Sequence, residues 1–264
     1  MFSIVRNGVR NGYPFIEAYA SWFDYCDRIF VLAGDSDDGT IAVLAELAAL
    51  DSRFSFDAAQ WPADSAGGTS IARFTDLARK RAAEGARRLM YVQADEIFTV
   101  GQRQLIRSWQ HGAAEFAGCI NFWNSLETVV EAEFPMTYLR HFPADAVVHS
   151  IGDGFGFELR DTHVTRFEEQ ILHYGWCFPV NILEKHVNHG RLYADQRPYA
   201  LRARLARKML ERRIYDRRLL DSLVPRYRSV PYQGDHPECV RHLIGLDVYN
   251  PHIGLDLLRA GTQW

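Results

Sequence analysis

Residues 87–98 read RRLMYVQADEIF. The apolar run LMYV is short, and a short apolar run of this kind indicates a buried strand. The strand leads directly into Gln93, Asp95 and Glu96. Because a buried carboxylate without a partner costs free energy, two acids at the end of a buried strand predict a cation or a polar ligand at that place.

The sequence before this strand alternates strand-like and helix-like patterns. The expected elements are strands at 2–5, 28–33 and 54–58 and helices over 15–23, over 40–50 and from Thr69 or Ser70 onward. In the last of these helices, the hydroxyl of Thr69 or Ser70 would cap the first turn. Strands that alternate with helices are typical of an α/β fold with a parallel sheet.

The rest of the chain has a different pattern. From Glu115 to Trp176 the sequence carries short apolar runs with little helical periodicity, which favours mixed or antiparallel strands that extend the first sheet. The last third is predicted to be helical over 179–190, 199–220 and about 237–247. No internal repeat or low-complexity linker divides the chain, so we expect one domain.

Composition excludes several classes of protein. The 264 residues carry a net charge of −3, so there is no overall basic field for nucleic acid. The four cysteines lie far apart without a C-x-x-C pair, which argues against a zinc knuckle or a redox motif. Such a pattern fits a reducing cytoplasm. The first residues, MFSIVRNG, lack a signal-peptide pattern. No apolar run approaches the roughly 20 residues of a membrane-spanning helix.

Three polar stretches follow strands that are predicted to be parallel: VRNG from Val5, GDSDDGT from Gly34, and QADE from Gln93. Ligands of open α/β sheets bind beyond the carboxyl ends of the strands, so these stretches are expected to converge on one crevice. The first does not supply G-x-G-x-x-G, and no G-x-x-x-x-G-K-[ST] occurs. The sequence therefore gives little support to a dinucleotide-binding site or a P-loop.

The acidic stretch GDSDDGT offers Asp35, Asp37 and Asp38 as acceptors for ribose hydroxyls or a base N–H. A capped acidic turn without a ligand is the alternative, because Asp38 could cap the helix that begins at Thr40. In QADE, Gln93 and Asp95 would face the same way if the strand continued. A hard cation such as Mg²⁺ or Mn²⁺ would match these oxygens, and a surface turn or salt bridge is the alternative.

Four stretches, FSIVRNG, FVLAGDSDDGT, MYVQADEIF and ILHYGW, resemble in order and spacing the successive motifs of bacterial family-2-type glycosyltransferases with the GT-A fold. The resemblance covers about residues 2–177 and is weaker beyond. It implies a GT-A-like, Rossmann-type mixed α/β sheet flanked by helices, with a helical C-terminal region, in a single domain. Residues 1–100 would form the nucleotide-sugar-binding half, 101–180 the acceptor half and 181–264 the C-terminal region.

The resemblance also assigns expected roles. Asp95 matches the second acid of the family's D-x-D motif, Glu96 the acid that often follows it, and Gln93 replaces the first acid. His173 in ILHYGW falls where many GT-A enzymes place a histidine that contacts the metal or the diphosphate. The expected metal ligands are Asp95, Glu96 and His173, with Mn²⁺ or Mg²⁺ as the cation and weaker dependence on it because Gln93 is uncharged. A core histidine is the alternative for His173.

The resemblance implies a nucleotide-diphosphate-sugar donor. The expected donor-binding residues are Val5, Arg6, Asn7, Asp35, Ser36, Asp38, Gln93 and Asp95. Among the arginines that could reach a diphosphate, Arg6 is favoured over Arg73 and Arg79 because it directly follows the first strand.

A displacement that inverts the sugar needs a carboxylate base near the acceptor hydroxyl. Asp153 in SIGDGFGFE is the leading candidate, because its glycine neighbours let a loop approach the substrate, and Glu158 is the second. A turn-forming role is the alternative for Asp153. A retaining outcome stays open. His149 and His163 are expected to be structural.

Two further features have alternative readings. Residues 202–218, RARLARKMLERRIYDRR, predict a basic helix, either a solvated face or a surface that docks on an anionic membrane or a lipid-diphosphate acceptor. Five aromatic residues could stack on sugar rings or belong to the core. They are Trp109, Phe122, Trp123, Tyr174 and Trp176.

The leading hypothesis is a glycosyltransferase that moves a sugar to a glycan or lipid-linked acceptor in surface polysaccharide or lipopolysaccharide synthesis. The protein would be cytoplasmic, with peripheral contact at the inner face of the membrane through the basic helix as an open alternative, and with no nucleic-acid partner. The rivals are a non-catalytic nucleotide-sugar or carbohydrate-binding protein and a nucleotidyltransferase. A nucleotidyltransferase would usually carry a basic Gly-rich loop early in the chain, and none is evident.

Overall fold

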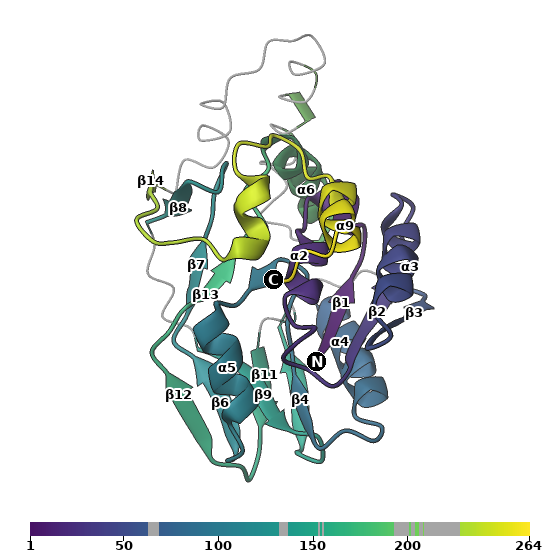
Figure 1. Ribbon diagram of the computed structural model, residues 1–264, viewed down its shortest axis with the longest axis vertical. Helices are drawn as coiled ribbons and strands as arrows, with labels where there is room; N and C mark the ends of the chain where they lie inside the picture. Colours follow the sequence, from purple (N-terminus) through teal and green to yellow (C-terminus); the bar gives the residue numbers. More distant parts are fainter. Residues whose placement is uncertain are drawn as a thin grey trace.

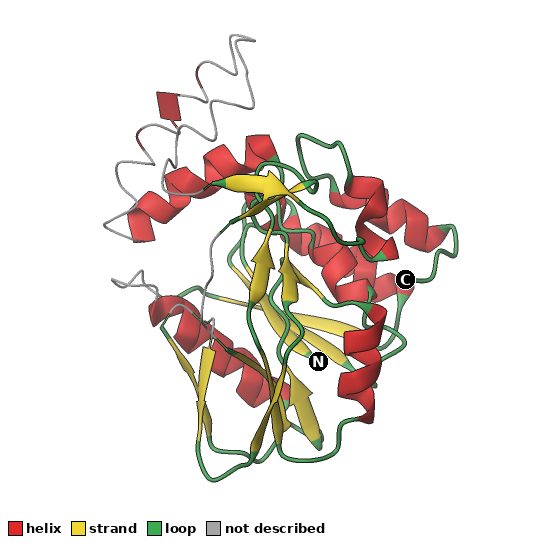
Figure 2. Cartoon of the chain, turned by 90° about the vertical axis from the view of Figure 1, so that its left-hand side faces the viewer, coloured by secondary structure: helices red, strands yellow, loops and turns green. Residues whose placement is uncertain are grey.

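The computed structural model describes residues 1–62, 69–131, 137–152, 154, 156–192, 201, 204, 205, 208 and 228–264, without the side chains of 189–192. Strands lie at its centre and helices on both sides of them (Figures 1 and 2). The central strands are β1 (Phe2–Val5), β2 (Ile29–Gly34), β3 (Phe54–Ala59), β4 (Arg88–Met90), β6 (Ala113–Phe116), β9 (Tyr138–Pro143) and β12 (Val164–Phe167).

These strands form two groups that meet at β1 and β4. In the first group β1, β2 and β3 are parallel. In the second, β9 runs antiparallel to β4 and β6, and β12 runs parallel to β6. Phe2 forms a parallel bridge with Tyr91, and its carbonyl accepts from the Val92 N–H at 3.1 Å. The predicted mixed α/β architecture is confirmed, whereas the GT-A assignment stays a prediction.

The central sheet is apolar on both faces, as expected for strands covered on both sides. Side chains alternate along β2: Val31 packs into one hydrophobic cluster and Leu32 into the other. The first cluster includes residues of helices α2 (Phe15–Ala20), α3 (Thr40–Leu50) and α9 (Pro251–Arg259). The second includes residues of α4 (Thr69–Ala82) and of the hairpin β10 (Val148–Ile151) and β11 (Gly156–Leu159).

A smaller sheet continues from the end of β4. Its order is β5-β13-β7, with β13 antiparallel to β5 and parallel to β7. The remaining elements are β5 (Glu96–Ile97), β7 (Cys119–Asn121), β13 (Ile171–His173), the pair β8 (Thr128–Val130) and β14 (Ser229–Pro231), α1 (Gly8–Asn11), α5 (Val100–Ser108), α6 (Pro179–Leu192) and the 3-10 helix η3 (Glu238–Leu243). This small sheet places His173 opposite Glu96.

The strands and helices predicted for the first hundred residues are all present, and α3 has the predicted bounds. In the last third, 179–190 is helical and 237–247 contains the short η3 helix, while most of 199–220 lies outside the described residues. The sequence patterns did not predict α1, α5, α9, β5, β12 or β14. The division into functional halves stays a prediction. In the part of the chain that the structure describes, no helix is both long and apolar enough to span a bilayer.

Candidate functional site

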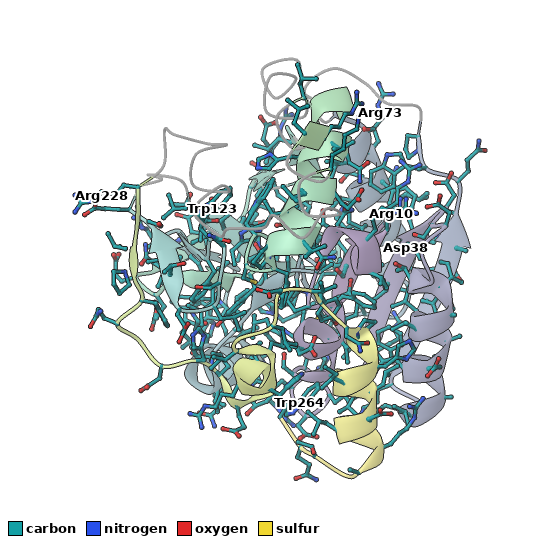
Figure 3. All side chains as sticks on the ribbon, turned by 90° about the horizontal axis from the view of Figure 1, so that it is seen from above. Arg10, Asp38, Arg73, Trp123, Arg228 and Trp264 are labelled. Atoms are coloured by element: carbon teal, nitrogen blue, oxygen red, sulfur yellow. The ribbon has the colours of Figure 1, made fainter. Side chains whose placement is uncertain are left out.

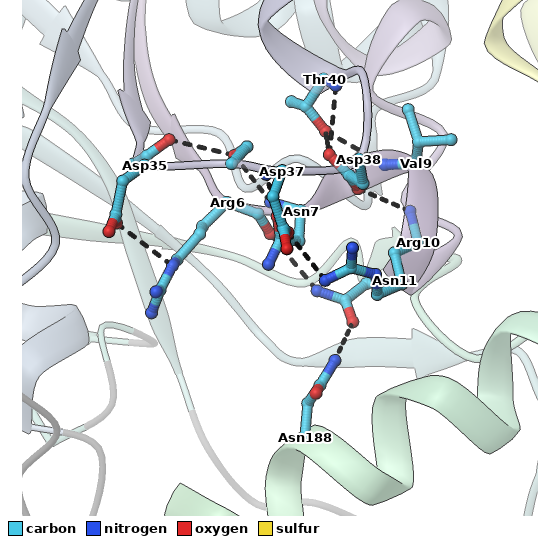
Figure 4. Close-up of polar contacts among 12 residues, drawn as sticks. Arg6, Asn7, Val9, Arg10, Asn11, Asp35, Asp37, Asp38, Thr40 and Asn188 are labelled. Carbon is cyan, nitrogen blue, oxygen red and sulfur yellow. Dashed lines mark hydrogen bonds and ion pairs between the residues drawn. The ribbon is translucent and has the colours of Figure 1, made fainter.

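The loops that follow β1 and β2 lie against each other and are joined by hydrogen bonds (Figure 4). Asn7 adopts a left-handed conformation (φ 51°), and its N–H donates to Ser36 Oγ at 2.9 Å. In return, the Asn7 side-chain oxygen accepts from the Asp37 N–H at 3.1 Å. The convergence predicted for VRNG and GDSDDGT is therefore present, and both loops sit at the carboxyl ends of parallel strands.

Asp38 is the centre of this junction. Its carboxylate accepts from the backbone N–H of Arg10 at 2.7 Å and of Thr40 at 3.1 Å, and from the Thr40 hydroxyl at 2.6 Å. Figure 3 shows Arg10 and Asp38 close together in the view from above. Asp38 thus ties the start of α3 to α1. It shapes the loop, and its oxygens are engaged by the protein.

Asp35 and Arg6 form a partly exposed ion pair between the two loops. Arg6 Nε lies 3.4 Å from Asp35 Oδ1, with side chains 34% and 56% exposed. The Arg6 guanidinium lies over the ring of Trp61, 5.2 Å from its centroid, and the backbone N–H of Trp61 donates to Asp35 Oδ1. A methyl group on Gly34 would come within 2.8 Å of the Trp61 ring, so only glycine lets the indole lie this close. An aromatic ring, a carboxylate and a guanidinium together suit a nucleoside diphosphate.

Asp95 lies in the turn between β4 and β5, and its carboxylate meets two basic side chains. Its Oδ2 is 3.3 Å from Nε2 of His173, at the end of β13, and 3.4 Å from Nζ of Lys185 in α6. All three residues are buried. Burial opposes the charged form of Asp95, but the charges of His173 and Lys185 outweigh it and hold the pKa of this carboxyl well below its usual value.

Lys185 is enclosed on several sides. Its Nζ donates to the carbonyl of Gly175 at 2.9 Å and lies 4.3 Å from the ring centroid of Trp176 and 4.6 Å from that of Tyr13. Burial lowers the pKa of Lys185, and the Asp95 carboxylate works against this shift. Sequence reasoning missed this lysine. The available signal was its place in the predicted helix, three residues after the buried Ile182, on a face that should be apolar.

Glu96 points to a different partner from Asp95. It accepts from Arg140, with Nη2 to Oε1 at 2.6 Å and Nε to Oε2 at 3.1 Å, and both side chains are fully buried. Its Oε2 also accepts from the Gln93 N–H at 3.0 Å. The structure therefore uses Glu96 inside the core and does not bring it to Asp95 and His173 as the expected third metal ligand.

The residues present do not fit a divalent cation as a resident group. Within the described ranges, no three His, Cys, Asp or Glu side chains come together as a set that could hold a metal. Asp95 and His173 do meet, but the third group beside them is the ammonium of Lys185. A cation is already provided by the chain at the place where the metal was expected.

Helix α6 connects this cluster to the loop after β1. Asn181 donates from Nδ2 to the carbonyls of Val9 and Arg10, both at 3.0 Å. Asn188 donates from Nδ2 to Asn11 Oδ1 at 3.2 Å (Figure 4). Together with the contact of Lys185 and Tyr13, these bonds make α1 the link between the two ends of the site. The predicted donor residues and the Asp95 cluster thus belong to one continuous region.

The hairpin of β10 and β11 brings a further loop to the site. Gln93 Nε2 donates to the carbonyl of Gly154 at 3.4 Å. Asp153, the leading candidate base, directly precedes Gly154 and lies outside the described residues. Glu158 is exposed on the hairpin and stands opposite the exposed His149 in register.

The other candidate residues lie in varied places. Phe122 and Tyr174 are buried, and their stacked rings have centroids 4.2 Å apart, so both belong to the core. Trp123 is buried, whereas Trp176 is partly exposed beside Lys185. Trp109 is partly buried and packs against Phe167, and Val5 is buried in the core. Arg73 and His163 are exposed, and Arg79 pairs with Asp76. Most of the helix predicted over 202–218 lies outside the described residues.

The similarity of this chain to known proteins is structural. No protein family model matches the chain, and no curated protein matches it. Among solved structures, the crystal structure of S. aureus TarS matches with a TM-score of 0.41 and 12% sequence identity. The match covers 79% of this chain but 43% of that chain, so the chain spans less than half of the length of TarS.

Proposed function

We propose that the chain is a glycosyltransferase that takes its sugar from a nucleotide-diphosphate donor. The observation that carries this proposal is the meeting, at one edge of a parallel sheet, of the loops after β1 and β2, the turn after β4 and the histidine at the end of β13. Ligands of α/β sheets bind at this edge. The residues that meet there are those that the sequence motifs single out.

The donor would lie along this edge. The base and ribose would contact Asp35, because it offers an exposed carboxylate beside Trp61, whose ring packs against Arg6 and Phe74. The diphosphate would extend toward Gln93, with Arg6 as the accessible positive charge. Asn7, Ser36 and Asp38 would act by holding the two loops in shape, since their polar atoms bond within the protein.

The acceptor would be a glycan or a lipid-linked sugar and would approach from the hairpin side. Gly154 contacts Gln93, so the neighbouring Asp153 is the proposed base. Its carboxylate would take the proton of the acceptor hydroxyl while that oxygen bonds to the anomeric carbon. The bond from the anomeric carbon to the diphosphate breaks in the same step, and the nucleoside diphosphate leaves with the electron pair. Glu158 is the second candidate for this role.

Calorimetric titration with UDP, GDP, dTDP and CMP tests the proposal. We expect saturable binding of one of the three nucleoside diphosphates, no comparable binding of the monophosphate CMP, and weaker binding in the Asp35→Ala variant. Absence of binding to all four would contradict a nucleotide-sugar donor.

A non-catalytic nucleotide-sugar-binding protein is the second candidate, because Gln93 stands where the family has an acid. Slow hydrolysis of the donor to free sugar separates the two. A transferase should release free sugar from the matching donor, and Asp153→Asn should lower transfer to an acceptor without changing donor affinity. A binding protein should release none.

We also propose a cytoplasmic site of action, with the basic segment 202–218 as a contact to anionic lipid. Co-sedimentation with anionic vesicles at low salt tests this contact, and binding should weaken as salt is raised. Equal recovery in the supernatant with anionic and neutral vesicles would count against it.

A further inference from the structure

The ammonium of Lys185 lies inside a set of groups that resembles the ligands of a metal ion. Its nearest acceptors are Asp95 Oδ2 at 3.4 Å and the Gly175 carbonyl at 2.9 Å. His173 Nε2 lies 3.3 Å from the same Asp95 oxygen. A carboxylate, an imidazole and a backbone carbonyl are all donors that Mn²⁺ accepts.

The spacing of these donors supports the comparison. Two ligands held at about 2.1 Å from one ion, at angles near 90–110°, lie roughly 3.0–3.4 Å apart. The separation of 3.3 Å between Asp95 Oδ2 and His173 Nε2 falls in this range. An ion could therefore bridge them with little movement if the space beside Asp95 were open. In this chain, the Lys185 ammonium occupies that space.

The surroundings of the ammonium hold it firmly. The rings of Trp176 and Tyr13 face it at 4.3 Å and 4.6 Å, an arrangement that stabilises a cation. A methyl group on Gly175 would come within 2.7 Å of Nζ and 2.2 Å of Asp95 Oδ2, so the glycine leaves room for the pair. The chain has 27 arginines and three lysines. A lysine at this point supplies a compact charge where the planar guanidinium of arginine would not fit as closely.

We propose that the Lys185 ammonium takes the place of a divalent cation beside Asp95, so that this protein binds its ligand without a metal. The inference rests on the proposed nucleotide-sugar site. Asp95 then serves as the anchor that holds Lys185, and the fixed positive charge lies at the end of the site toward which the donor diphosphate would extend. Lys185 acts as a positioning residue through the local charge.

Titration of the protein with Mn²⁺ alone tests the inference, with the free Mn²⁺ signal followed by electron paramagnetic resonance. The wild-type protein and Asp95→Asn should leave the same amount of Mn²⁺ free. Lys185→Met removes the ammonium while keeping an unbranched apolar side chain, and it should bind one Mn²⁺ at least tenfold more tightly than the wild type. That binding should disappear in Lys185→Met with Asp95→Asn. The exposed Lys80→Met on α4 is the matched control and should behave as wild type.

Two results would overturn the inference. One is saturable Mn²⁺ binding by the wild type that Asp95→Asn abolishes. The other is a Lys185→Met variant that keeps the wild-type circular dichroism spectrum and gains no Mn²⁺ binding. If Lys185→Met does not fold, the titration of the wild type with Mn²⁺ alone decides whether a metal ion or Lys185 supplies the positive charge beside Asp95.

A nucleotide titration separates this inference from the proposed function. If a nucleoside diphosphate binds the wild type, its affinities in EDTA and in Mn²⁺ should differ by less than threefold. A tenfold or greater gain in affinity with Mn²⁺ would contradict the inference while supporting the nucleotide site. Failure of all nucleotides to bind would reject the proposed function, and the Mn²⁺ titration would still decide the role of Lys185.

Discussion

Asp95 and Glu96 are adjacent in the sequence, but their carboxylates meet different basic partners. Asp95 lies in the turn before β5 and faces Lys185 and His173. Glu96 begins β5 and faces Arg140 within the core. The strand therefore ends on two acids for two separate reasons. The first acid belongs to the candidate site, and the second neutralises a buried arginine.

Replacing Glu96 with Gln should destabilise the protein strongly. The substitution leaves the fully buried guanidinium of Arg140 without its counter-charge. Breaking a buried ion pair from one side costs about 3–5 kcal/mol. Urea denaturation measures the loss as a lower midpoint with an unchanged slope.

The double substitution of Glu96 and Arg140 with Met is the control for this assignment. It removes both charges and should recover a large part of the lost stability, because no charge stays buried alone. A Glu96→Gln protein with wild-type stability would contradict a structural role for this acid.

Asp38→Ala should loosen the junction of the two nucleotide-side loops. The change removes the acceptor for the N–H groups of Arg10 and Thr40. Leaving such groups without a partner costs about 1–3 kcal/mol, and affinity for the matching nucleotide should fall together with stability. Asp37→Ala is the matched control, because its carboxylate is mostly exposed and forms a surface ion pair with Arg10. Thermal unfolding and calorimetry of both variants check the difference, and equal effects would count against the role given to Asp38.

The stability of the protein should fall between pH 7 and pH 5. Burial, with the nearby Arg88, lowers the pKa of His141 to about 3, and burial with the nearby Lys185 lowers the pKa of His186 to about 4. The unfolded chain binds protons near pH 6.5, so it holds more protons than the folded chain at pH 5 and is favoured there. Each histidine should contribute about 2 kcal/mol to the loss.

His141→Gln checks this assignment. The variant keeps a polar group beside Arg88 but has no titration in this range, so its stability should change less between pH 7 and pH 5 than that of the wild type. Chemical denaturation at the two pH values gives the comparison. An unchanged pH dependence in the variant would show that His141 does not carry the effect.

The sequence predicted the first half of the fold well because its local signals agree with one another. In α3, for example, the acidic turn, Thr40 and the helical spacing of Ile41, Leu44 and Leu47 all favour the observed helix. Helix α5 was missed although Thr99 and Gln102 form a capping box, since the helix is short and amphipathic within a strand-rich region.

The candidate site was only partly predictable. The meeting of Asp95 with His173 followed from motif order, but its third partner is Lys185, which lies 90 residues from Asp95 in the sequence. The pairing of Glu96 with Arg140 was likewise not predictable, because β5 and β9 belong to different sheets and only their packing brings the two side chains together. Long-range charge pairs depend on packing, and local patterns do not contain this information.

Arg6→Gln should weaken nucleoside diphosphate binding about tenfold, which corresponds to roughly 1.4 kcal/mol. Arg6 follows β1 at the edge where the loops meet, and its guanidinium is partly exposed beside Trp61. Stability should change little, because its ion pair with Asp35 is partly exposed to solvent. Arg73→Gln, an exposed site on α4, is the matched control and should bind as wild type. Calorimetry at low and high salt measures both, and the wild-type affinity should decline with salt more steeply than that of Arg6→Gln. Equal losses in the two variants would mean that general surface charge, and not a diphosphate contact at Arg6, attracts the nucleotide.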